Sequence, residues 1–258
     1  MDIMTAIFQY FPIFCIVLMR MSGFIITAPI FNSRNIPPHL KIFLSLALSA
    51  FVFLLIYPDH AVPAFDISFI ILAVSEFLIG VVIGFSAQFL FAAIQLAGQS
   101  IDMQMGFGMV NVMDPQSGMQ VPLMGTFKYL LAVLVFFLIN GHHFLIEALI
   151  QSYSIVPLEG ISITPSLISL LTDLTADIFL VAFKLAAPLI GALFISDFVM
   201  GIMARTVPQM NVFLVGMPAK IVAGFFLILV IIPLYVYLLS ALFERCFKDT
   251  LQIIKVLV

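Results

Sequence analysis

The stretch ISFIILAVSEFLIGVVIGFSAQFLFAAIQLA, which occupies residues 67–97, decides the fold that we expect for this chain. It contains one ionisable residue, Glu76, in an otherwise uncharged and mostly apolar run. A helix needs about 20 mostly apolar residues to cross a hydrocarbon layer of about 30 Å, whereas the strands of membrane barrels are about 10 residues long and alternate in polarity. The stretch therefore predicts a membrane helix, and its excess length predicts tilt, a kink or a broken hairpin.

Stretches of the same kind fill most of the sequence. There are about six of them, each able or nearly able to span a bilayer: residues 3–31, 42–57, 67–97, 123–150, 178–204 and 212–243. Hydrophobic residues make up 64% of the 258 residues and charged residues only 9%, against about 45–50% and about 25% in soluble domains. This composition predicts an all-α membrane protein. The net charge of −3 excludes the basic surface that nucleic-acid binding requires.

Single charged residues lie within these apolar stretches: Arg20, Glu76, Lys128, Glu147, Lys184 and Asp197. A charge at the centre of a membrane helix costs about 2.5–3.5 kcal/mol on insertion scales, so such residues normally face protein partners or water. We therefore expect these helices to pack against other helices, and we expect other chains to supply some of them.

The distribution of basic residues leads to the same expectation. Arg34 and Lys41 flank the first loop, and Arg245 and Lys248 lie near the C-terminus. The positive-inside rule places both regions in the cytoplasm. Five apolar stretches lie between the first loop and the C-terminus. If each of them crossed the bilayer once, the two regions would lie on opposite sides of the membrane. We therefore predict that several helices are broken or hairpin-like, with their irregular backbone protected inside an assembly.

The stretch at residues 67–97 also contains Gly80 and Gly84. Two glycines four residues apart allow helix backbones to approach closely. Plain helix packing is the simpler interpretation. Because Glu76 lies one turn before Gly80 on the same face, a buried hydrogen bond or ion pair between helices is the more specific one.

The most unusual segment, residues 98–122, is rich in methionine and glycine. Methionine is unbranched and fills irregular gaps, and glycine permits backbone conformations that are closed to other residues. The segment also contains the turn signal Asp114-Pro115. Two interpretations stay open: an interfacial loop, and a compliant seal in a conduit that yields to varied passengers.

A polar turn separates the last two apolar stretches. Pro208 predicts a helix end there, and Arg205, Gln209 and Asn211 offer polar contacts. The other polar cluster, residues 140–143 with a glutamate four residues further on, provides too few ligands to predict a metal site. We find no nucleophile–base arrangement and no phosphate-binding glycine loop, so we predict neither a cofactor nor enzymatic activity.

Several motifs, taken in order, resemble those of the FliR/SctT family of type III secretion export-gate proteins. They cover almost the whole chain: Arg20-x-x-Gly23, Pro29-x-Phe31, Ile36-Pro37-x-x-x-Lys41, Glu76-x-x-x-Gly80-x-x-x-Gly84, Gly98, Gly106, Asp114-Pro115, Asn140-Gly141-His142-His143, Ala187-Pro188 and Arg205-x-x-Pro208-Gln209-x-Asn211-x-Phe213. The last motif is the most specific. The resemblance implies an export-gate subunit that conducts unfolded flagellar subunits and belongs to the flagellar basal body in the bacterial inner membrane.

The resemblance also implies partners and a division of the chain. It implies a helical assembly with FliP-type and FliQ-type subunits, near FlhB-type and FlhA-type export proteins. Residues 1–177 would be FliP-like, with a plug loop at 106–122, and residues 178–258 would form a FliQ-like hairpin. The predicted seal residues are Gly106, Phe107, Gly108, Met109, Val110, Met113, Gly118 and Met119. The predicted subunit contacts are Arg20, Glu76, Gly80, Gly84, Arg205, Pro208, Gln209 and Asn211.

Three other functions stay open on the sequence. A virulence secretion system of the injectisome type has a related export gate. A secondary transporter for a small solute would hold its substrate between broken helices at mid-depth, and would work alone or as a homodimer. A structural assembly protein of the basal body would need no seal.

Overall fold

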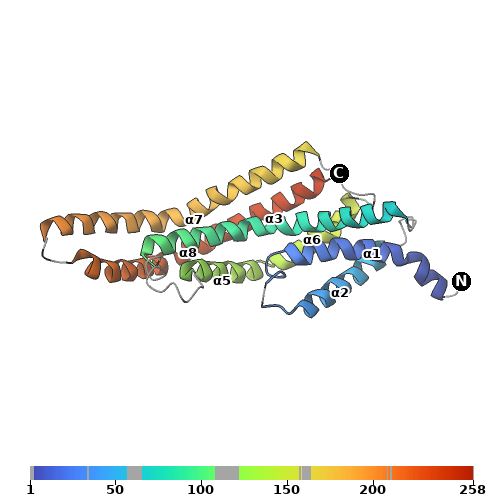
Figure 1. Cartoon of the computed structure of the whole chain (residues 1–258), viewed down its shortest axis with the longest axis horizontal. Helices are drawn as coiled ribbons and strands as arrows, with labels where there is room; N and C mark the ends of the chain where they lie inside the picture. The colour runs from blue at the N-terminus through green and yellow to red at the C-terminus, as the bar shows by residue number, and fades with distance from the viewer. Residues whose placement is uncertain are drawn as a thin grey trace. The chain divides into compact units, whose positions relative to one another are not determined.

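The computed structural model describes residues 3–33, 35–56, 66–107, 122–156, 158, 164–207, 209 and 211–257. All regular secondary structure within these ranges is helical (Figure 1). The helices are α1 (Ile3–Thr27), α2 (Pro38–Ile56), α3 (Ile67–Met105), α5 (Leu123–Leu138), α6 (Gly141–Ile155), α7 (Pro165–Thr206) and α8 (Val212–Val256).

Five of these helices, α1, α2, α3, α7 and α8, are long and apolar enough to cross a membrane. Helices α5 and α6 pass the same test only together, and they are bent by 66° at the break between them. The prediction of an all-α membrane protein with about six apolar helical stretches is confirmed. We expected several stretches to be broken or hairpin-like, and the described residues contain one bent pair, α5 with α6.

For residues 67–97 we expected tilt, a kink or a broken hairpin. Helix α3 runs without interruption from Ile67 to Met105, so no broken hairpin forms there. Residues 123–150, expected as one stretch, instead contain the bend. Asn140 there adopts the left-handed conformation with φ 57°. Asparagine tolerates this conformation better than most residues, and it separates the end of α5 from the start of α6.

Helix α7 begins thirteen residues before the predicted start at 178. Its first turn has a favourable beginning, because the Thr164 hydroxyl accepts the Leu167 N–H at 3.3 Å and Pro165 occupies the first helical position. Helix α3 begins in a similar way: the Asp66 carboxylate accepts the Ser68 N–H at 3.0 Å. Hydrogen bonds from Ser68 lower the pKa of Asp66.

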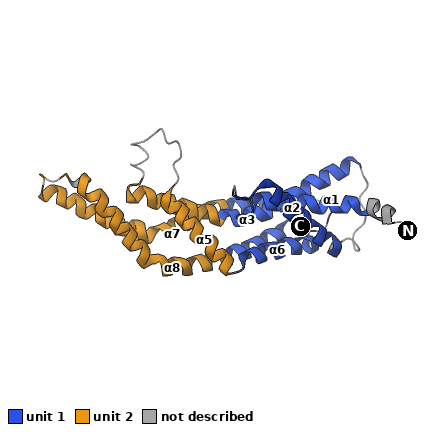
Figure 2. Cartoon of the chain, turned by 90° about the horizontal axis from the view of Figure 1, so that it is seen from below, with its two compact units in different colours: residues 1–89, 140–174, 244–258 blue, residues 90–139, 175–243 orange. Residues whose placement is uncertain are grey.

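The chain forms two compact units (Figure 2). Unit 1 comprises residues 1–89, 140–174 and 244–258, and unit 2 comprises residues 90–139 and 175–243. In unit 1, fully buried side chains of α1, α3 and α6 form the core: Ile13, Ile16, Phe24, Ile79, Ile83, Leu145 and Leu149. In unit 2, the rings of Phe91, Phe136 and Phe243 pack with centroids 5.3–5.7 Å apart. The predicted boundary between the FliP-like part, residues 1–177, and the FliQ-like part, residues 178–258, falls inside α7. This division of the chain stays a prediction.

Candidate functional site

The clearest polar feature of unit 1 is a buried ion pair between α1 and α3. Arg20 Nε donates to Glu76 Oε2 at 2.5 Å, and Arg20 Nη2 donates to Oε1 at 2.9 Å. Both side chains have no exposed surface. This fork-to-fork geometry satisfies both carboxylate oxygens at once, and it is the arrangement in which arginine and a carboxylate interact most strongly.

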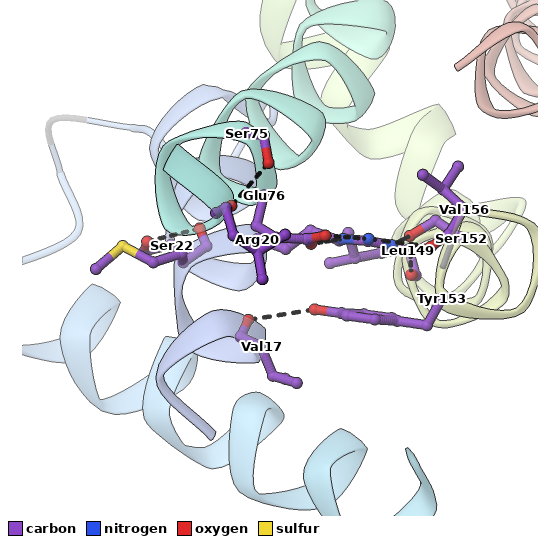
Figure 3. A network of polar contacts seen from close by, with 11 residues as sticks. Val17, Arg20, Ser22, Ser75, Glu76, Leu149, Ser152, Tyr153 and Val156 are labelled. Carbon is purple, nitrogen blue, oxygen red and sulfur yellow. Dashed lines mark hydrogen bonds and ion pairs between the residues drawn. The ribbon is translucent and has the colours of Figure 1, made fainter. Parts of the chain in front are cut away.

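Helix α6 completes the coordination of Arg20 (Figure 3). Its guanidinium donates to Ser152 Oγ at 3.0 Å and to the carbonyl oxygen of Val156 at 3.2 Å, just past the end of α6. The guanidinium carbon lies 4.1 Å from the centre of the Tyr153 ring, and the Tyr153 hydroxyl donates to the Val17 carbonyl at 3.2 Å. One buried cation therefore connects α1, α3 and α6.

The two glycines that follow Glu76 allow the pair to form. A Cβ added at Gly80 would overlap the backbone carbonyl of Arg20, and one at Gly84 would overlap the Thr27 hydroxyl. Helices α1 and α3 thus pack backbone against backbone. The Thr27 hydroxyl also reaches the Val81 carbonyl of α3 at 3.2 Å. The predicted close helix contact and the predicted buried ion pair at Glu76 both occur here.

Four residues that we assigned to contacts between subunits therefore meet one another inside unit 1. They are Arg20, Glu76, Gly80 and Gly84. We expected other chains to shelter the charges embedded in the apolar stretches. For Arg20 and Glu76 the shelter comes from the chain's own helices.

The other embedded charges lie in several kinds of environment. In unit 2, Asp197 Oδ1 pairs with Lys220 Nζ at 2.6 Å, and Asp197 Oδ2 accepts from Gln104 Nε2 at 2.8 Å. Sequence reasoning missed Lys220, because the two partners are 23 residues apart on separate helices. In contrast, Lys184 is exposed on α7, and Glu147 is exposed on α6.

Lys128 is buried in unit 2 but has no acidic partner among the residues that the structure describes. Its ammonium group donates to the Leu185 carbonyl at 3.3 Å and lies 4.4 Å from the centre of the Tyr235 ring. A carbonyl dipole and an aromatic face stabilise a cation without neutralising it.

Two of the predicted seal residues, Gly106 and Phe107, lie in the described part of the chain, where they end α3. Gly106 has φ 91°, and the Phe107 N–H donates back to the Asp102 carbonyl at 3.1 Å. Glycine adopts this positive φ without steric cost, so it is suited to ending the helix. The other predicted seal residues lie outside the described residues: Gly108, Met109, Val110, Met113, Gly118 and Met119.

The two ends of the methionine-rich segment are held together by Asp102, a residue that sequence reasoning did not single out. Its carboxylate accepts the Met124 N–H at 2.9 Å and the Gly125 N–H at 3.1 Å, at the first turn of α5. The residue before α5 is Pro122, which provides no side-chain cap. Asp102 on α3 therefore caps α5 from outside, where a carboxylate also favours the positive end of the helix dipole.

Close packing accompanies this cap. A Cβ at Gly98 would overlap the backbone of Gly125, so α3 and α5 touch through two glycines. Just past the end of α3, the Phe107 ring packs edge to face against the Phe225 ring of α8, with the ring centroids 6.3 Å apart. The described residues at the start of the predicted seal, and those that follow it, thus make packing contacts within unit 2.

The polar turn between α7 and α8 contains the remaining predicted contact residues. Arg205, Gln209 and Asn211 are all exposed, and Pro208 lies outside the described residues. Helix α7 ends at Thr206, in agreement with the helix end predicted near Pro208. The Asn211 side chain accepts the Leu214 N–H at 3.3 Å and so caps α8.

Comparison with known proteins identifies the chain's relatives. The model of the family "Bacterial export proteins, family 1" matches residues 11–246. Flagellar biosynthetic protein FliR of Bacillus subtilis (strain 168) is 36% identical over 230 residues, which is 88% of each chain. FliR of Escherichia coli (strain K12) is 33% identical over 237 residues, covering 92% of this chain and 90% of its own.

A relative with a different name extends the comparison. Yop proteins translocation protein T of Yersinia pestis is 30% identical over 178 residues, or 68% of this chain and 67% of its own. These proteins carry the names of biosynthetic and translocation components, and the similarity to the flagellar ones covers the larger share of the chain. With the match to the family model covering nearly its whole length, the chain belongs to the bacterial export proteins of family 1.

Proposed function

We propose that this chain is a subunit of a flagellar type III protein export gate. The observation that carries the proposal is the similarity to FliR of Bacillus subtilis over 88% of both chains. The gate would be assembled with FliP-type and FliQ-type subunits, in contact with FlhB-type and FlhA-type export proteins. It would lie in the bacterial inner membrane at the flagellar basal body and conduct unfolded flagellar subunits. The chain contributes no catalytic step of its own.

The seal of this gate would be the segment 106–122. A passage for unfolded chains has to be closed when no substrate is present, and it has to open for side chains of many shapes. Its closing element therefore has to be deformable. Three methionines and three glycines in this segment provide flexible apolar side chains and permissive backbone. The cap that Asp102 provides to α5 supports this role, because it holds the described ends of the segment together.

The contacts to other subunits would include the turn between α7 and α8. Arg205, Gln209 and Asn211 are exposed and polar, and they lie between two long apolar helices. Exposed hydrogen-bonding groups at such a position can be satisfied by a neighbouring helix. Cysteine pairs placed at 209 and on the neighbouring FliP-type or FliQ-type subunit should cross-link in the assembled gate.

The seal is tested by replacing residues 108–121 with a Gly/Ser linker of equal length. The described ends, from Asp102 to Phe107 and from Pro122 onward, stay intact. We expect cells that carry the assembled variant gate to leak ions and small dyes. The matched control is the same replacement of residues 57–65, the connection between α2 and α3, which should not leak. Unchanged conductance in the first variant, with the gate assembled, would refute the seal and favour a purely structural role.

The 30% identity to the Yersinia translocation protein makes an injectisome gate the second candidate. Complementation separates the two candidates, since the gene should restore motility in a fliR deletion and not secretion in an injectisome mutant. A small-solute transporter is the third. Native mass spectrometry of gently solubilised membranes distinguishes it, because the export gate requires unlike partners and the transporter requires none.

A further inference from the structure

Lys128 and Tyr235 in unit 2 are two buried polar residues whose side chains lack the partners that they need. Lys128 is 7% exposed and interacts with one carbonyl and one ring face. The Tyr235 hydroxyl is buried and makes no hydrogen bond within the described part of the chain. Burying an unneutralised cation and an unsatisfied hydroxyl is costly, so the site is set up for an anionic, hydrogen-bonding group that comes from outside the chain.

A cavity lies against both groups. It has a volume of about 20 Å³ and is lined by Lys128, Tyr235, Leu185 and apolar side chains of α5 and α8. A cavity of about 10–15 Å³ is enough for one water molecule, so this one admits a single oxygen atom. An oxygen placed there can accept hydrogen bonds from the ammonium group and from the hydroxyl.

An apolar groove of about 370 Å³ adjoins the cavity and shares Phe127, Ile228 and Ile232 with it. The other side chains that line the groove are also apolar: Leu123, Met124, Phe225 and Leu229. Leu123 and Leu229 are at least half exposed, so the groove can be reached from outside. A mostly apolar pocket of this size with a charged residue at one end is typical of a site for a small amphipathic ligand.

The chemistry of the groove and the cavity points to the occupant. The groove is lined by apolar side chains, which match an acyl chain, and the cavity at its edge holds an ammonium group that lacks a carboxylate partner among the described residues, which matches an anionic headgroup. Lipids combine both parts and surround a multi-pass membrane protein at high concentration.

We propose that the groove and the cavity form one binding site for an acidic phospholipid. One acyl chain lies along the groove between α5 and α8, and one phosphate oxygen accepts hydrogen bonds from Lys128 and Tyr235. The site is independent of the export function proposed above, since it requires only the helices of unit 2 and a bilayer. Its effect would be to neutralise a buried cation only where anionic lipid is present.

The test is native mass spectrometry of the purified full-length chain with equal amounts of phosphatidylglycerol and phosphatidylcholine that carry the same acyl chains. We expect the wild type to retain phosphatidylglycerol about fivefold better, which is the contribution of one lysine to binding an anionic headgroup. Lys128→Met should lose this preference. Lys184→Met, which removes an exposed charge of α7 in the same unit, should keep it.

A second variant keeps the proposal falsifiable if loss of the lysine affects folding. Leu229→Trp enlarges an exposed rim residue and obstructs the groove, so it should reduce the retention of both lipids. Circular dichroism confirms that each variant is folded. The proposal is wrong if the wild type shows no preference, if Lys128→Met keeps it, if Lys184→Met loses it as Lys128→Met does, or if Leu229→Trp retains both lipids unchanged.

Discussion

The pair formed by Arg20 and Glu76 should behave as one unit when either partner is replaced. Removing one member of a buried ion pair leaves the other charge unpaired, which costs about 3–5 kcal/mol. Replacing both members with apolar residues of similar size is often neutral or stabilising. We therefore expect Arg20→Met and Glu76→Met each to cost about 3–5 kcal/mol, and the double variant to cost less than either single one.

The contacts of Arg20 explain why the loss of Glu76 costs free energy of unfolding. After Glu76→Met, Arg20 still has the Ser152 hydroxyl, the Val156 carbonyl and the Tyr153 ring as partners. These contacts hold the guanidinium in place but do not neutralise it. The double variant removes both charges and these contacts with α6, so its stability reports how α1, α3 and α6 pack without an unpaired charge.

The assay is reversible unfolding in detergent, followed by far-ultraviolet circular dichroism because the chain has no tryptophan. Glu147→Met is the matched control, since this glutamate is exposed on α6 and, among the described residues, its side chain accepts one hydrogen bond, from Gln151 in the same helix at 3.2 Å. It should change the free energy of unfolding by less than about 0.5 kcal/mol. Additive effects of the two single substitutions at Arg20 and Glu76 would show that the pair does not act as a unit.

Two further predictions concern helix contacts. Gly80→Ala should destabilise the chain by about 1–3 kcal/mol because its Cβ meets the Arg20 carbonyl. At Gly191 an added Cβ meets no described atom within 4 Å beyond the neighbouring backbone of its own helix, so Gly191→Ala should stabilise α7 by up to about 1 kcal/mol. Equal effects in the same unfolding assay would contradict the backbone contact. Asp102→Ala should cost about 0.5–2 kcal/mol and speed amide exchange at Met124, whereas Asp102→Asn keeps an acceptor oxygen and should lose less. Exchange rates that are equal in all three proteins would rule out the cap.

The sequence predicts the helices well because their apolar runs are long and their ends carry local signals. Pro208 marks the end of α7, and the run from Ile67 continues as one helix. The errors arise where a local signal is weak or is overridden. The bend at Asn140 depends on one residue in the left-handed conformation. The polar cluster at 140–143 lies within a mostly apolar run, and it does not by itself predict that a helix ends there. The early start of α7 depends on the Thr164 cap, in a segment that reads as a polar connection.

The candidate site was predicted less completely, because its contacts join residues that are far apart in the sequence. Glycine spacing and a nearby glutamate were enough to predict a buried interaction at Glu76. They could not show that the partner is Arg20, which is 56 residues away. Nothing in the local sequence of Asp102 indicates that it caps a helix that begins 21 residues later. Such roles become visible only when the helices are placed side by side.

The buried charges also show why a count of embedded ionisable residues predicts partners only in part. Arg20 and Lys128 look alike in sequence, since each is a single cation in an apolar stretch. In the fold, Arg20 meets a carboxylate and is neutralised within unit 1, so it fixes how the helices pack and requires nothing from outside. Lys128 meets a carbonyl and a ring, beside an open apolar groove, and stays a cation in need of an anion. The difference lies in the presence or absence of a carboxylate on the facing helix. The residue that lacks one is therefore the better guide to what the chain binds.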